Sequence, residues 1–559
     1  MKLIVGNSLI ILSLFVYTAC AQEHGQQANQ SMQPAAQHQS HEEHSLSVDS
    51  IPVELLTKPI ALRAGVGKVN DAVTTASKEA QAFYNQGMAY LHAYVWIEAA
   101  RSFNQALKLD DKLAMAHLGL YRAYIGLNIN ASAREALDKA QQLMMNASPR
   151  ERRRILAHAK QFDAITDINN TAKHEAYKKA LDDALLTDAN DVELLLLRGN
   201  AEEGVPATGR GQRGLEGSRK FYLKAVEFAP EHAGAHHFLT HTYENMGKVN
   251  EALKHGELTA KYAPEVPHMR HMYGHDLRRV GRIKEAIAEF NKADELQRAY
   301  FVSEQISPEY DWHNQHNLDL LSTCYQHQGQ MKRAEEIMRQ AFNLPSFMEA
   351  EAYNKKEYPA FLLARGRTDE ALEAANRLIK TKWEIVQAVG YIMTSHIQMT
   401  KNKLPEASAA AKNALQVLQN SGKKFTLINN DLAVLQGVFF LRTGQKEKGE
   451  AVLRQAVQKI RAEQGPDNWT QALFQLEAIA RVAREVGNWE LAEFITAQML
   501  DHDANYGGAH YAMALVYEHQ GDKAKAIAAL TLAEKLWSDA DTDLPELAAI
   551  KIKLVELRK

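Results

Sequence analysis

An interval of 34 residues recurs in this chain and constrains its fold more than any other feature. It separates Gly247 from Gly281 and is also the distance between two His-x-x-x-His pairs. The pairs are His237/His241 and His271/His275. A fixed period of this length predicts one supersecondary unit per repeat, and each unit needs its neighbours to bury its apolar face.

The composition indicates that the repeated unit is helical. The 559 residues include 30 glycines and 14 prolines, while 46% of the residues are hydrophobic. Few helix-breaking residues and ample apolar material favour helices over sheets. The 65 basic and 68 acidic residues are mixed along the chain and leave a net charge of −3. No basic stripe points to nucleic acid as a partner.

The residues that recur identify the kind of helical unit. The first clear unit contains Phe83, Gly87, Tyr90, Ala99, Phe103, Ala106 and Asp111. Its pattern resembles the tetratricopeptide repeat family at positions 4, 8, 11, 20, 24, 27 and 32 of the repeat. Small residues at positions 8, 20 and 27 allow paired helices to approach, and a glycine near position 15 ends the first helix.

The resemblance implies an all-α solenoid, a superhelix of antiparallel helix pairs. We expect an N-terminal array over 74–345 and a C-terminal array with a final helix over 346–559. The units at 114–190 and 388–430 match the pattern less well. A glycine-rich insertion at 203–217 predicts a loop inside one repeat, and 299–316 lengthens a junction. The insertion lacks the Gly-Lys-Ser/Thr ending of a phosphate loop.

The resemblance also implies which side chains line the concave groove. In the family, positions 2, 5, 9, 12 and 13 of the first helix face this groove, and we expect them to be exposed. Carried over, these positions hold His237, His241, Glu244, His268, His271, His275, Arg278 and Arg279. The next repeat adds His316, Asp319 and His327.

This histidine face supports two interpretations. Imidazoles four residues apart share one helix face, so neighbouring helices could hold one zinc or copper ion between them. The expected ligands are His237, His241, His271, His275 and His316. The alternative is a metal-free polar groove that contacts a peptide or small ligand. Neither pair has the glutamate of a His-Glu-x-x-His motif, so a zinc protease is not expected and no catalytic residue is assigned.

The N-terminus predicts export. Lys2 precedes an apolar run over residues 3–17, and Ala19-Cys20 resembles a bacterial lipobox. Residues 1–21 are therefore interpreted as a signal peptide, with Cys20 as the lipidation site; cleavage to a soluble periplasmic product is the alternative. Residues 22–73 are expected to form a disordered His- and Gln-rich tether and lead-in. Its His24, Met32, His38, His41 and His44 suit a spacer or a metal-collecting arm.

The other cysteine, Cys324, falls at repeat position 10 and is expected to be a buried, inert thiol. The block from Ala235 to His275 resembles uncharacterised exported bacterial tetratricopeptide proteins that share a His-rich centre. That resemblance supplies no reaction. The sequence predicts an outer-membrane or periplasmic protein that binds an envelope protein, peptide or small ligand and touches the membrane only through its lipid anchor. The second hypothesis is a zinc or copper metalloprotein, with hydrolysis as its reaction if it is an enzyme.

Overall fold

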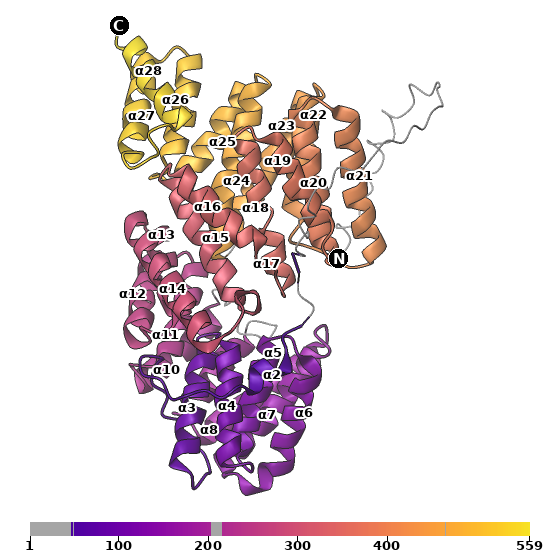
Figure 1. The fold of residues 1–559 in the computed structure, drawn as a ribbon, viewed down its shortest axis with the longest axis vertical. Coiled ribbons are helices and arrows are strands. Elements are labelled where there is room, and N and C mark those ends of the chain that lie inside the picture. Colours follow the sequence, from indigo (N-terminus) through magenta and orange to yellow (C-terminus); the bar gives the residue numbers. More distant parts are fainter. Residues whose placement is uncertain (1–45, 48–49, 203–214, 464) are drawn as a thin grey trace, which may run out of the picture. The chain divides into compact units, whose positions relative to one another are not determined.

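The computed structural model describes residues 46–47, 50–202, 215–463 and 465–559. The signal segment with Cys20, the His-rich part of the tether and most of the glycine-rich insertion lie outside the described residues. Within the described ranges the named elements are all helices, which confirms the all-α prediction (Figure 1). No helix in this described part is long and apolar enough to cross a membrane.

The chain forms two compact units, which we call the N-terminal and C-terminal units. The N-terminal unit comprises Ser50–Pro308 together with 465–468. The C-terminal unit comprises Glu309–Glu463 and Trp469–Lys559, with residues 46–47. The division falls within the lengthened junction at 299–316, whereas the sequence placed the boundary between the two arrays near residue 345.

The N-terminal unit consists of consecutive antiparallel helix pairs. Its helices are α2 (Val53–Thr57), α3 (Lys78–His92), α4 (Trp96–Leu109), α5 (Ala114–Gly126), α6 (Asn130–Leu143), α7 (Pro149–Ile165), α8 (Thr171–Thr187), α9 (Val192–Ala201), α10 (Glu216–Phe228), α11 (Ala233–Asn245), α12 (Val249–Tyr262), α13 (Pro267–Arg279) and α14 (Ile283–Glu304). Successive helices pack on one another, α3 on α4 and α13 on α14 among them. Short 3₁₀ turns lie at Met144–Asn146 and Pro308–Tyr310.

The C-terminal unit continues the same pattern of helix pairs. Its helices are α15 (Trp312–His327), α16 (Met331–Asn343), α17 (Glu349–Asn354), α18 (Glu357–Ala364), α19 (Thr368–Ile379), α20 (Glu384–Thr400), α21 (Leu404–Ser421), α22 (Asn429–Arg442), α23 (Lys446–Ala462), α24 (Pro466–Glu485), α25 (Trp489–His502), α26 (Gly507–His519), α27 (Lys523–Leu536) and α28 (Pro545–Leu557). Figure 1 shows α26 and α27 running side by side before the final helix α28.

The packing within a pair follows the predicted register. A Cβ atom added to Gly87 would lie 2.6 Å from the ring of Phe103, and one added to Gly274 would lie 2.8 Å from the ring of Phe290. Position 8 is therefore glycine because the aromatic side chain at position 24 occupies the space of a Cβ. Both phenylalanines are buried.

The turn between the helices of a pair requires a left-handed residue. Gly247 and Gly281 have φ angles of 71° and 79° at this point. Asn128 takes the same role with a φ of 61°. Tyr94, at repeat position 15 of the first pair, also has a positive φ, of 59°. For a bulky residue this conformation is unusual and costs about 1–2 kcal/mol, so other contacts must hold Tyr94 in place.

Residues 50–73 are folded, in contrast to the disordered lead-in that the sequence suggested. The side chain of Asn104 donates to the carbonyl of Leu56 at 2.9 Å, and that of Gln86 donates to the carbonyl of Ala61 at 3.1 Å. The hydroxyl of Tyr84 donates to Asp71 at 2.9 Å. Polar side chains of α3 and α4 thus form hydrogen bonds with polar groups of this extended segment. Composition alone does not reveal these contacts.

Candidate functional site

The two helices with the histidine pairs begin 34 residues apart. The side chain of His232 caps α11 by accepting from the backbone N–H of Ala235 at 3.1 Å. Pro267 opens α13 at its first position, where the missing N–H costs nothing. Each helix therefore starts at a fixed residue, and that start sets the face on which its histidines lie.

The histidines are buried, unlike the exposed groove residues expected from the repeat register. His237 and His271 are 0% exposed, His268 and His275 are 2% exposed, and His241 is half-buried. For His237 the cause is the end of α3, which packs against α11. The Nδ1 atom of His237 lies 2.7 Å from the carbonyl oxygen of His92, and a Cβ on Gly234 would collide with the side chain of His92.

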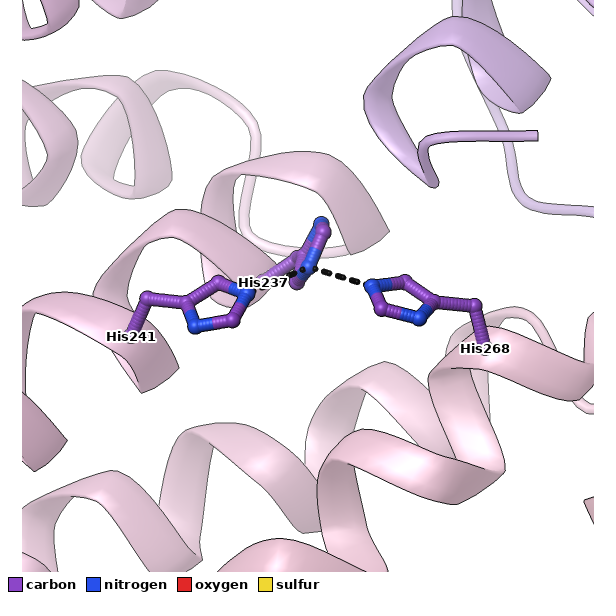
Figure 2. Close-up of side chains that lie close together, drawn as sticks. All are labelled: His237, His241 and His268. Carbon is purple, nitrogen blue, oxygen red and sulfur yellow. Dashed lines mark hydrogen bonds between the residues drawn. The ribbon is translucent and has the colours of Figure 1, made fainter. Parts of the chain in front are cut away.

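The Nε2 atoms of three of the histidines lie close together. The Nε2 atom of His237 lies 3.1 Å from Nε2 of His241 and 3.1 Å from Nε2 of His268 (Figure 2). One nitrogen from each residue lies within 4.8 Å of the other two. We call His237, His241 and His268 the histidine triad. His237 and His241 were among the predicted ligands, and His268 was predicted as a residue of the groove.

The contact with His92 fixes the protonation of His237. A carbonyl oxygen only accepts, so Nδ1 of His237 carries the hydrogen and Nε2 carries a lone pair. Burial lowers the pKa of His237 to about 3, with the hydrogen bond to the His92 carbonyl opposing this effect. The ring is therefore neutral at pH 7, and its lone pair faces the other two imidazoles.

His271 and His275 form a second pair on α13, and the ring of His271 stacks on that of His268 with centroids 5.8 Å apart. Their Nε2 atoms are 2.6 Å apart. Glu244 lies near His275, at 3.9 Å from its Nδ1, and accepts from Arg279 at 3.4 Å. Burial raises the pKa of Glu244, but the interactions with His275 and Arg279 outweigh burial and hold the pKa below its usual value. Glu244 is thus a buried carboxylate that remains charged.

A third cluster, missed from the sequence, joins His92, Glu193 and His232. The Nε2 atom of His92 lies 2.7 Å from the Glu193 carboxylate, which also accepts from Arg122 at 3.2 Å. The lone pair of His232 on Nδ1 is already used by the cap of α11, so its hydrogen lies on Nε2, facing Glu193 at 3.9 Å. Because the ring nitrogens and the carboxylate already interact with one another and with protein groups, the cluster is a buried ion-pair network that connects α3, α9 and α11.

The remaining predicted site residues belong to α13 and α15. Arg278 is buried on α13. His316, Asp319 and His327 all lie on α15, which belongs to the C-terminal unit. There His316 stacks on Trp312 with ring centroids 5.7 Å apart, and the buried His327 bonds to Asp503 at 3.1 Å. Cys324 is buried on the same helix, as predicted.

The C-terminal unit contains a groove that the sequence did not reveal. A cavity of about 350 Å³ lies along α18, α20, α22 and α24, which are first helices of successive pairs. Its apolar lining includes Phe361, Ile392, Met393, Val434, Val438 and Phe474. Its lining also includes two ion pairs, Lys356 with Asp431 at 2.8 Å and Arg442 with Glu485.

Several solved structures are similar to this chain at low sequence identity. The chain is 13% identical to a tetratricopeptide repeat protein from Parabacteroides merdae, covering 52% of this chain and 99% of that one, with a TM-score of 0.29. Yeast Tom70 is 14% identical, with 86% and 96% covered and a TM-score of 0.30. Human IFIT1 is 12% identical, with 83% and 92% covered and a TM-score of 0.35.

The residues and the repeated helix pairs of the chain identify its family. No match was found among curated proteins. Residues 507–536, which form α26 and α27, match the family model described as a tetratricopeptide repeat. The same helix pair, with a left-handed glycine in its turn, recurs through both units. The chain is therefore a tetratricopeptide repeat protein.

Proposed function

We propose that this chain is an interaction scaffold, and that the groove of the C-terminal unit binds an apolar segment of a partner protein. The observation that carries the proposal is the apolar cavity lined by four successive first helices. A concave, mostly apolar cavity with a few polar groups is the usual form of a binding site. Stacked helix pairs commonly present their binding surfaces in this way.

The helix α20 supports this interpretation. Its Val389, Ile392 and Met393 line the cavity and are themselves nearly buried, so the helix contributes core side chains to the cavity wall. Burial also lowers the pKa of His396 in this lining to about 4, so it adds no charge at pH 7.

The cavity fits a partner that inserts a few apolar side chains. Its volume of about 350 Å³ is at the lower end of the range of ligand pockets, roughly 300–1,000 Å³. An amphipathic helix laid in a groove presents such side chains at i, i+3 or i+4, and i+7. The ion pairs in the lining, Lys356–Asp431 and Arg442–Glu485, place both signs of charge beside the apolar surface.

A peptide library displayed on phage tests this proposal. Selection on the wild-type chain is expected to enrich peptides with apolar residues at helical spacing. Val434→Glu, which places a charge in the lining, is expected to weaken binding of the selected peptides by at least about tenfold, as burial of an unpaired charge costs more than 1.4 kcal/mol. Val555→Glu, on the exposed face of α28, is the matched control. Equal binding to both variants would contradict the proposal.

We also propose that the scaffold acts in the cell envelope, anchored through Cys20. The support is the charged start at Lys2, the apolar run over 3–17 and the Ala19-Cys20 sequence. Metabolic labelling with palmitate in a bacterial host is expected to label the wild-type chain and not Cys20→Ser. If both are unlabelled and both reach the soluble periplasmic fraction, the alternative cleavage is correct.

A further inference from the structure

We propose that the histidine triad is a binding site for one divalent transition-metal ion, with zinc as the favoured metal. The ligand atoms are Nε2 of His237, His241 and His268. This proposal does not depend on the proposed scaffold function, because the triad belongs to the N-terminal unit and the groove belongs to the C-terminal unit.

The spacing of the three nitrogens fits a shared ion. Imidazole nitrogens bind zinc at about 2.0–2.1 Å, so two of them on a tetrahedral ion lie about 3.3–3.4 Å apart. Nε2 of His237 is 3.1 Å from Nε2 of His241 and from Nε2 of His268. An expansion of about 0.2–0.3 Å therefore brings His237 to ligand spacing with each of the other two, and one nitrogen of each residue lies within 4.8 Å of the others.

The second contact of His237 is the one that a metal ligand requires. Histidines that bind a metal through one nitrogen commonly donate the other N–H to a carbonyl or carboxylate. Here Nδ1–H of His237 donates to the carbonyl of His92 at 2.7 Å. The lone pair on Nε2 is thus directed toward the other two rings before any ion arrives (Figure 2).

Tyr94 provides an independent observation at the same place. Its ring centroid lies 4.5 Å from that of His237, 5.7 Å from that of His268 and 6.2 Å from that of His241. Tyr94 holds the left-handed turn position where Gly247 and Gly281 stand in other pairs. A bulky residue in a costly backbone conformation, packed over three convergent ligands, is typical of a functional site.

The charges nearby suit a cation. Glu244, on the same helix as His237 and His241, is buried and interacts electrostatically with His241. Neutral imidazoles bring no counter-charge to a divalent ion, and Glu244, which also pairs with Arg279, is the buried carboxylate that interacts with the triad. Imidazole ligands favour zinc or copper over magnesium or calcium, which prefer oxygen.

Metal titration of the full chain tests the proposal. The protein is prepared without a histidine tag and with His24, His38, His41 and His44 of the tether changed to glutamine, which removes a competing metal-collecting arm. After chelation it is titrated with zinc, and the bound metal is counted by native mass spectrometry. We expect one tightly bound zinc ion per chain.

Two variants locate the ion. His241→Gln, which removes the half-buried ligand, is expected to weaken zinc binding by more than about tenfold. Removing a residue that only hydrogen-bonds to a metal ligand already weakens binding by about 10–100-fold. His255→Gln is the control, because His255 is also half-buried but pairs with His236 outside the triad. No tight zinc binding by the parent chain, or unchanged binding by His241→Gln, would overturn the proposal.

A second measurement does not require the variant to fold. Diethylpyrocarbonate acylates accessible imidazole nitrogens, and a bound metal protects them. In the parent chain zinc is expected to protect His241 and leave the reaction of His255 unchanged. If zinc leaves the reaction of His241 unchanged, three hydrogen-bonded imidazoles without a metal are the correct description.

Discussion

His237 and His92 are 145 residues apart in the sequence, yet Nδ1 of His237 lies 2.7 Å from the carbonyl oxygen of His92. The contact joins the end of α3 to the middle of α11. It has two consequences, because it covers the ring of His237 and also determines which of its nitrogens carries the hydrogen. The histidine face is therefore part of the interior of the N-terminal unit, at a point where its first helix pair meets a later one.

The conformation of Tyr94 predicts a difference between two substitutions. Both Tyr94→Ala and Tyr94→Gly remove the ring that packs on His237 and Trp96, and each is expected to destabilise the fold by about 3–5 kcal/mol. Glycine accepts the φ of 59° without strain, so Tyr94→Gly is expected to be more stable than Tyr94→Ala by about 1 kcal/mol. Urea denaturation measures this difference. An alanine variant as stable as the glycine variant would show that the turn is unstrained.

The contact between Gly274 and Phe290 predicts a coupled pair. Gly274→Ala is expected to destabilise the fold by about 1–3 kcal/mol, because the new methyl group would lie 2.8 Å from the Phe290 ring. Phe290→Leu alone leaves a cavity and is also destabilising. In the double variant the smaller leucine makes room for the methyl group. Its loss of stability is therefore expected to be smaller than the sum of the losses in the two single variants. A double-mutant cycle measures this coupling, and strict additivity would contradict the packing described.

The sequence predicts the parts of the fold that depend on neighbouring residues. The helix pairs, the small residue at position 8 and the left-handed turn near position 15 recur within one repeat, so periodicity reveals them. Gly87 against Phe103 and Gly247 with its φ of 71° are both confirmed in this way.

The parts that were missed depend on residues far apart in the chain. The triad is buried because the α3–α4 turn packs on α11, and no pattern within a repeat contains that contact. His268 stands at repeat position 2, and only the packing of α13 on α11 brings its Nε2 atom beside that of His237. The apolar groove combines side chains from four pairs, one of them in the region around 388–430 where the repeat pattern is weak.

The buried ring of His158 predicts an acid-sensitive step in stability. Burial, together with the positive charge of Arg122, lowers its pKa to about 3. In the unfolded chain the pKa is about 6.5. At a pH between these two pKa values, His158 is protonated in the unfolded state but not in the folded state. The free energy of unfolding therefore falls as the pH falls below 6.5.

Replacing this ring isolates its contribution. From pH 6.5 to pH 5 the free energy of unfolding is expected to fall by about 1.5 kcal/mol more in the wild-type chain than in His158→Gln. Urea denaturation at several pH values measures the two slopes. His174→Gln, an exposed histidine on α8, is the control and is expected to retain the wild-type slope. Parallel slopes for the wild type and His158→Gln would contradict the assignment.

Asp276 predicts a pH dependence of the opposite sign. Burial and the nearby charge of Glu244 raise its pKa well above the usual value. Among the described residues neither carboxyl oxygen has a hydrogen-bond partner, and a side chain on Gly256 would collide with one of them. The folded state therefore keeps a proton that the unfolded state loses above about pH 3.9, so this residue costs stability as the pH rises.

A neutral replacement is expected to remove that cost. The unfolding free energy of Asp276→Asn relative to the wild type is expected to grow with pH by about 1.4 kcal/mol per unit above pH 4, until the pH reaches the pKa of the folded state. Chemical denaturation from pH 4 to pH 7 measures this gain. Asp183→Asn, which changes an exposed carboxylate on α8, is the matched control and is expected to show a nearly constant difference from the wild type. A constant difference in unfolding free energy for Asp276→Asn as well would contradict this prediction. It would mean that Asp276 is ionised in the folded protein and is stabilised by a partner outside α12 and α13.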